Sequence, residues 1–255
     1  MAVIWGLDLH EIRWSKFANS NMWSRRYHLR RTKFIVYQLA MILCVVSESL
    51  GTAALSDYVS QQRFIERHDG RAAVHNDDFV GAASYNIFVG IYVATIFGAG
   101  FFFDLIWPER RESRAVRWAW RVCSVLACLF ALSSAIAVTV ITASSRARIT
   151  GVDAATARAD LKASGDYPLE YSSNAHAIAS VVFEWAGLLA TIAATIVLWM
   201  SYRHNERFGP LSAHVRAEEG VKEKNPGVEE NANAFDAAPV TGGTSQTEPP
   251  RHEAV

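Results

Sequence analysis

Long apolar stretches, separated by polar and charged segments, set the pattern along this chain. Four stand out: Phe34–Leu55, Phe79–Phe103, Val122–Ala143 and Ala177–Trp199. In an α-helix, about 20 consecutive and mostly apolar residues match the thickness of the hydrocarbon core of a bilayer. The pattern therefore predicts an all-α fold, a four-helix transmembrane bundle with a disordered cytoplasmic tail.

The same pattern divides the chain into three parts. Residues 1–32 form a basic N-terminal segment on the cytoplasmic side, residues 33–203 hold the four spans, and residues 204–255 form the tail. From Gly209 onward Pro, Gly, Glu, Asn, Ala and Thr dominate, and no apolar periodicity remains. A segment of this composition buries too little apolar surface to offset the entropy of ordering, which is why we predict disorder there.

The placement of Lys and Arg predicts the orientation of the spans, although the formal net charge of the chain is zero. Basic residues gather in the N-terminal segment, in the connection between the second and third spans and at the start of the tail. These segments together carry about twice as many of them as the other two connections. Because basic flanks stay on the cytoplasmic side, we expect a multi-pass protein of the plasma membrane or an endomembrane with both termini in the cytoplasm.

The N-terminal segment admits two interpretations. Trp5, Leu9 and Ile12 stand at helical spacing ahead of a basic run, Arg25–Lys33. In the first interpretation a short helix lies on the inner leaflet, and the basic run is attracted to acidic lipid headgroups. In the second, the basic run only sets the topology and has no lipid specificity.

A stripe of small residues on the second span predicts close helix packing. Asn86, Gly90, Ala94 and Gly98 recur every four residues, and the other spans carry comparable lines. Lipid provides little hydrophobic drive for helices to associate, so close backbone approach through small residues supplies much of the packing. We therefore assign Gly90, Ala94 and Gly98 to a helix-packing stripe. The alternative is the general abundance of Ala and Gly in membrane helices.

A polar layer is predicted in the outer half of the bundle. Counted from the outer ends of their spans, Glu48, Asn86 and Glu184 all lie roughly 12–14 Å deep at the rise of a helix. Ionisable residues at such depth are costly and usually face the interior of a bundle. The layer is either a pocket for a cation, a proton or a lipid headgroup, or a set of neutral side chains that hydrogen-bond neighbouring helices together.

Two further charged residues lie at the cytoplasmic edge of the spans. Asp104 follows the second span and Arg121 precedes the third. A short connection joins these spans, so they are expected to be antiparallel neighbours. The sequence therefore predicts a structural ion pair between Asp104 and Arg121.

Sequence motifs for catalysis are absent from the chain. It contains no Walker-type glycine loop, no nucleophile elbow, no His-x-x-x-His pair and no Cys-x-x-Cys pair. His68 and His75 fit no standard zinc spacing. We therefore expect a protein that is not an enzyme, with no cofactor, no metal and no nucleic-acid partner. The expected partners are membrane lipids, other membrane proteins or further copies of the chain.

The chain resembles tetraspan membrane proteins of the MARVEL-like type and an uncharacterised group of fungal four-span proteins. The resemblance covers about residues 24–210 and rests on span order and on the runs KFIVYQLAMILCVVSESLGTAALSDY and HNDDFVGAASYNIFVGIYVATIFGAGFFFDLIWPER. It implies a role in membrane-domain organisation or trafficking. The Cys-Cys-Gly signature of true tetraspanins is missing, since Cys44, Cys123 and Cys128 all lie inside spans.

Two functions follow as hypotheses. The first is an organiser or adaptor in a membrane domain or in trafficking. The alternative is a small transporter or channel-like protein that uses the layer of Glu48, Asn86 and Glu184. Permeation needs a polar path that continues to the cytoplasm. Because mainly Ala, Gly and bulky apolar residues follow the layer on that side, the sequence favours the organiser.

Overall fold

The computed structural model describes residues 3–4, 7–8, 12–110, 112–165 and 167–224. It divides into two units, residues 1–212 and residues 213–255. The first unit contains the bundle and both candidate sites. The second begins with the helix α7, Ala213–Lys224.

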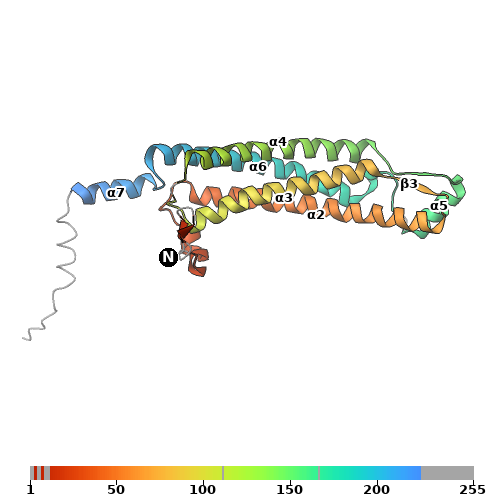
Figure 1. Ribbon diagram of the computed structural model, residues 1–255, viewed down its shortest axis with the longest axis horizontal. Coiled ribbons are helices and arrows are strands. Elements are labelled where there is room, and N and C mark those ends of the chain that lie inside the picture. Colours follow the sequence, from red (N-terminus) through yellow and green to blue (C-terminus); the bar gives the residue numbers. More distant parts are fainter. Residues whose placement is uncertain (1–2, 5–6, 9–11, 111, 166, 225–255) are drawn as a thin grey trace, which may run out of the picture. The chain divides into compact units, whose positions relative to one another are not determined.

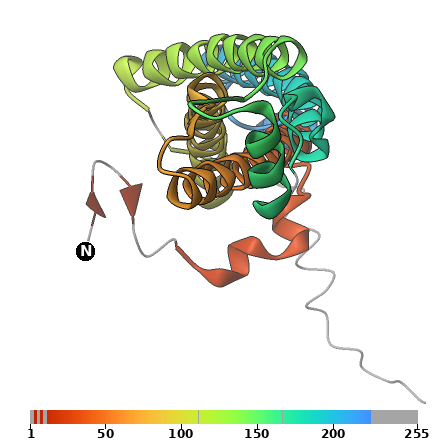
Figure 2. The ribbon, with the colours of Figure 1, turned by 90° about the vertical axis from the view of Figure 1, so that its right-hand side faces the viewer.

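Four long helices form the bundle: α2 Arg30–His68, α3 Asp77–Ile106, α4 Arg114–Ser144 and α6 Ala175–Phe208 (Figure 1). All four are long and apolar enough to cross a membrane, which confirms the all-α, four-helix prediction. α2 packs beside α3 and α6, and α4 closes the ring by packing against the same two helices, as Figure 2 shows from one end. We call the end where α2 begins and α6 ends the basal end, and the opposite end the distal end.

The helices extend well beyond the apolar stretches. α2 continues from Leu55 to His68, through a polar segment that contains no Gly or Pro and therefore no residue that would end a helix. Side chains cap two of the other helices at their first turns: Ser113 accepts a hydrogen bond at the start of α4, and Asn174 does so at the start of α6. Hydropathy thus locates the spans, whereas capping and helix propensity set the ends of the helices.

A small folded cap covers the distal end. The strands β3, Ala73–His75, and β4, Arg148–Thr150, pair antiparallel. The helix α5, Ala154–Ala163, and the 3-10 turn η3, Tyr171–Ser173, follow in the same connection. The Tyr171 hydroxyl, on a fully buried side chain, donates to the Asp78 carboxylate of α3 at 3.0 Å. This contact ties the connection to the bundle.

The N-terminal segment contains short elements. The strands β1, Val3–Ile4, and β2, Leu7–Asp8, pair antiparallel, and they are followed by the 3-10 turn η2, Trp14–Phe17, and the short helix α1, Asn19–Met22. Residues 3–4 and 7–8 are therefore strands rather than parts of a helix, while Trp5 and Leu9 lie outside the described residues.

This segment contacts the basal end of the bundle. Lys16 Nζ donates to the carbonyl oxygen of Ile106 at 2.6 Å. Further along, Tyr27 and Leu211 form an isolated β-bridge. The segment before α2 is thus joined to the segment after α6.

The predicted tail differs from the structure at two places. Residues 204–208 continue α6, which ends at Gly209 with a positive φ of 78°. Residues 213–224 form α7, because Ala, Glu and Lys, all strong helix formers, outweigh the single Gly220. Residues 225–255 of the predicted tail lie outside the described residues.

Glycines let the long helices approach closely. A Cβ atom added at Gly187 of α6 would lie 2.8 Å from Cys44 Sγ and 3.3 Å from the Cys44 backbone nitrogen on α2. The predicted stripe on α3 also faces α2, since a Cβ at Gly90 would meet Glu48 and one at Gly98 would lie 3.1 Å from Met41 Sδ. Ala94, between them, is half-buried.

The outer surface of the bundle is apolar. Each long helix exposes more than half of at least one large apolar side chain: Ile42, Ile91, Leu129 and Leu189. Contiguous apolar surface of this extent is costly in water and favourable against lipid. Small residues thus lie at the contacts between the helices, and large apolar residues cover the outside of the bundle.

Candidate functional sites: a polar layer and a basal cavity

The polar layer draws residues from α2, α3 and α6. Asn86 and Glu184 are each 1% exposed, whereas Glu48 is half-buried at the interface between α2 and α3. Asn86 and Glu184 therefore face the interior of the bundle. The Glu48 side chain lies against Gly90 instead, where an added Cβ would overlap its carboxylate.

A hydrogen-bond network joins all four long helices at this depth. Ser47 and Ser180 each donate to the other's carbonyl oxygen at 2.9 Å. Asn86 Nδ2 donates to the hydroxyls of both serines at 3.2 and 3.3 Å, and Ser134 donates to Asn86 Oδ1 at 3.4 Å. Gly51 makes room for this network, since a Cβ there would lie 3.2 Å from Ser180 Oγ. Serines and one amide, rather than the two acids, link the helices.

Glu184 lies beside this network without joining it. Neither of its carboxyl oxygens has a hydrogen-bond partner among the described residues. The hydroxyls of Ser47 and Ser134 lie near the carboxyl group, outside hydrogen-bond geometry. A buried polar group without a partner is costly. Glu184 is therefore the residue of the layer that the fold leaves unsatisfied.

Polar groups continue from the layer toward the basal end. Cys44 contacts the Thr191 hydroxyl at 3.8 Å, and Cys128 contacts the Thr195 hydroxyl at 3.2 Å. Thr195 in turn donates to the carbonyl oxygen of Ser124 at 3.1 Å. Between the layer and the basal end, the interior of the bundle is thus more polar than the apolar pattern of the sequence indicates. These polar residues lie where α6 packs against α2 and α4.

The predicted ion pair between Asp104 and Arg121 is wrong. Asp104 instead pairs with Lys33 at 2.6 Å and with Arg110 at 2.9 Å, while Arg121 pairs with Glu206 at 2.8 Å. The physical reason is the rotation of α4 about its axis, which directs Arg121 toward α6. The connection after α3 then brings Arg110 back over the end of its own helix.

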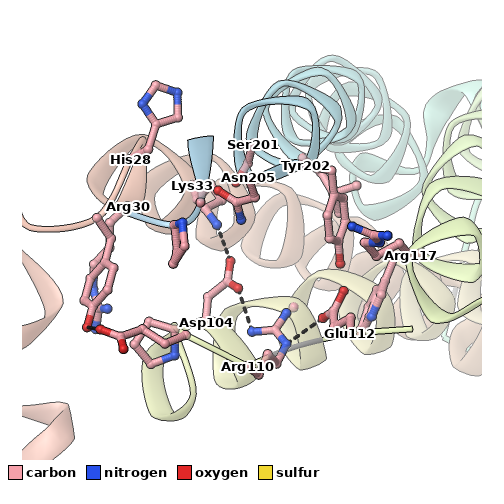
Figure 3. A pocket seen from close by; sticks show the side chains of 18 of the residues that line it. His28, Arg30, Lys33, Asp104, Arg110, Glu112, Arg117, Ser201, Tyr202 and Asn205 are labelled. Carbon is pink, nitrogen blue, oxygen red and sulfur yellow. Dashed lines mark hydrogen bonds and ion pairs between the residues drawn. The ribbon is translucent and has the colours of Figure 1, made fainter. Parts of the chain in front are cut away.

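A cavity of about 530 Å³ opens at the basal end (Figure 3). It lies between the start of α2, the end of α3 with the connection that follows, the start of α4 and the end of α6. A row of alternating charges, Lys33, Asp104, Arg110 and Glu112, crosses it, with the last link from Arg110 Nε to Glu112 Oε1 at 2.5 Å. Sequence reasoning missed this site, because its residues come from four separate segments.

Arg110 and Tyr27 each keep one protonation state in the cavity. Burial by itself lowers the pKa of Arg110, but the carboxylates of Asp104 and Glu112 outweigh it and hold that pKa above its usual value. Burial also raises the pKa of Tyr27, and its hydrogen bond to Glu109, at 2.9 Å, raises it further. Arg110 is therefore a cation and Tyr27 a neutral donor at any physiological pH.

Arg30 is the most enclosed cation that lines this cavity. Its side chain is 3% exposed, and its guanidinium lies 5.1 Å from the ring centre of Tyr27 and 5.2 Å from that of Phe34. Nη2 makes one long hydrogen bond of 3.5 Å to the carbonyl oxygen of Leu105. Nε and Nη1 have no hydrogen-bond partner among the described residues. In the sequence, Arg30 is one of several basic residues before the first span, and no local signal distinguishes it.

The fold defines a class of protein, a four-helix bundle whose long helices are compatible with a multi-pass integral membrane protein. No protein-family model, curated protein or solved structure matches the chain. The resemblance to MARVEL-like tetraspan proteins therefore rests on span order and the two sequence runs alone.

Proposed function

We propose that this protein is an organiser or adaptor in a membrane domain, which binds lipids and neighbouring membrane proteins along its lateral surface and at its basal end. The observation that carries the proposal is the contrast between a closed interior and a broad apolar exterior. Gly187 brings α6 against Cys44 of α2, and Gly90 brings α3 against Glu48. Large apolar side chains cover the outside of every long helix. The lateral surface and the ends are thus the parts that partners reach.

Co-purification tests this role. The full-length protein is extracted in native lipid discs, and lipids and proteins in the discs are quantified against discs formed around an unrelated four-span protein. We expect enrichment of particular lipids or membrane proteins. Discs with the composition of the bulk membrane and a single copy of the chain would contradict the proposal.

The orientation proposed with this role places the basal end and both termini in the cytoplasm. The support is the excess of basic residues in the segments at that end. In right-side-out vesicles, tags at either terminus are expected to resist external protease, while a tag inserted at the exposed Gly165 of the distal cap is cut. A protected tag at Gly165 together with cleaved terminal tags would reverse the orientation.

A second candidate function is favoured by one observation, the unsatisfied carboxyl group of Glu184. With 1% exposure and no hydrogen-bond partner in the residues that the structure describes, this group is suited to hold a proton or to accept a cation that reaches the layer. The polar contacts of Thr191 and Thr195 extend from it toward the basal end. A small transporter or channel-like protein would use this route.

Replacing Glu184 with glutamine separates the two functions. Glutamine keeps the shape of a neutral glutamic acid but carries no exchangeable acidic proton. If the role is organisation, Glu184→Gln is expected to leave folding and co-purifying partners unchanged, and liposomes with wild type show no proton or cation flux above protein-free liposomes. Flux through wild type that Glu184→Gln abolishes, with Glu48→Gln as the matched control, would favour the transporter.

A further inference from the structure

We propose that the basal cavity binds a phosphate group, supplied by an anionic lipid headgroup or by a soluble phosphate ester, with Arg30 as its anchor. The proposal rests on the membrane placement given above but not on the organising role.

The Arg30 guanidinium needs hydrogen-bond acceptors, and a phosphate group provides them. A guanidinium presents its donors in a planar fork that matches two oxygens of a phosphate. Here two nitrogens of the fork are buried without an acceptor in the described part of the chain, although Arg30 lines a cavity large enough for a small ligand. Packing against the rings of Tyr27 and Phe34 holds the guanidinium in place but provides no acceptor.

The charges around the cavity leave a positive surplus. Asp104 and Glu112 are engaged by Lys33 and Arg110, so these four residues balance one another. The remaining carboxylate, Glu109, accepts the hydrogen bond of Tyr27.

Among the described residues, two cations that line the cavity have no carboxylate closer than 3.9 Å. Arg30 makes no ion pair with any described residue, and Arg117 reaches Glu206 only at 3.9 Å and keeps a buried Nε without a hydrogen-bond partner. Outside the balanced set of four, the cavity is thus lined by two cations, Arg30 and Arg117, and one carboxylate, Glu109. This excess of positive charge favours an anionic ligand.

The place of the cavity in the fold indicates where the ligand comes from. It lies at the ends of α2, α3 and α6, level with the expected headgroup region of the bilayer. The Tyr27 ring covers one face of the guanidinium, and the two unpartnered nitrogens are buried. A phosphate therefore reaches Arg30 when the Tyr27 side chain turns aside.

Binding of short-chain lipids to the detergent-purified, full-length protein tests the proposal. The probes are dihexanoyl phosphatidic acid, dihexanoyl phosphatidylcholine, glycerol 3-phosphate and inorganic phosphate, and the readouts are native mass spectrometry and the shift of the thermal midpoint. We expect phosphatidic acid to bind wild type and Arg30→Gln to weaken it by about tenfold or more, the loss expected for a charge-assisted hydrogen bond.

Arg31→Gln is the matched control, because Arg31 is the next residue of α2 and is exposed. It is expected to change binding by less than about twofold, as exposed charges contribute little. Arg117→Gln provides a second variant, expected to weaken binding about threefold, in case Arg30→Gln does not fold.

The probes also identify the source of the phosphate. Binding of phosphatidic acid without binding of the soluble probes indicates a lipid headgroup, whereas Arg30-dependent binding of glycerol 3-phosphate or inorganic phosphate indicates a soluble ester. The proposal is overturned if no probe binds wild type, or if Arg30→Gln and Arg117→Gln both bind as wild type does. Neither result bears on the lipid and protein enrichment that tests the organising role, so the two proposals fail separately.

Discussion

Replacing Gly187 with leucine is expected to force α2 and α6 apart and to lower the thermal midpoint of the detergent-purified protein by about 5–10 °C. The Cβ alone would lie 2.8 Å from Cys44 Sγ and 3.3 Å from the backbone nitrogen of Cys44. A side-chain atom can rotate away from such a contact, but the backbone of α2 moves only with the whole helix. The measurement is thermal unfolding followed by circular dichroism.

Three further leucine substitutions form a graded control on α3. Gly90→Leu meets the Glu48 side chain and Gly98→Leu meets the flexible end of Met41, so both are expected to cost less than Gly187→Leu. Thr95→Leu, on the exposed face of α3, is expected to leave the midpoint unchanged within about 2 °C. Equal midpoints for all four variants would show that close approach through glycine does not stabilise this bundle.

Removing Asp104 is expected to be the most disruptive change at the basal end. Its carboxylate is the shared partner of Lys33 and Arg110, whose side chains are only 11% and 12% exposed. Without Asp104, Lys33 loses its partner and Arg110 keeps only Glu112, and breaking a buried ion pair in this way costs about 3–5 kcal/mol. Asp104→Leu is therefore expected to lower the free energy of unfolding by this amount, measured by denaturation in detergent.

A double-mutant cycle identifies the true partner of Asp104. Lys33→Leu combined with Asp104→Leu is expected to cost less than the sum of the single changes, by about 0.5–3 kcal/mol, because the pair is removed together. Arg121→Leu combined with Asp104→Leu is expected to be additive within about 0.5 kcal/mol, since Arg121 pairs with Glu206. Coupling of Asp104 to Arg121 but not to Lys33 would restore the ion pair that the sequence alone suggested.

Particular residues show how far sequence reasoning reaches into the candidate sites. Counting along helices placed Asn86 and Glu184 at one depth, and both are buried in the interior. Counting does not give their contacts, however. The network joins Asn86 to Ser47 and Ser180, and it leaves Glu184 without a hydrogen-bond partner among the residues described. Depth follows from the fixed rise of a helix, whereas contacts depend on how each helix is rotated.

The sequence by itself determined an all-α fold with four helices that are long and apolar enough to cross a membrane. Length and apolar composition suffice for that conclusion, because a backbone in lipid must satisfy its hydrogen bonds within each helix. Only the tertiary structure decided that Asp104 pairs with Lys33 and Arg110. It also decided that Arg30 is buried beside a cavity, with two nitrogens that have no hydrogen-bond partner within the described ranges. The physical reason is that charged partners are chosen by the rotation of helices against one another and by the return of a connection over a helix end. Neither the rotation of the helices nor the path of the connection produces a periodic pattern in the sequence.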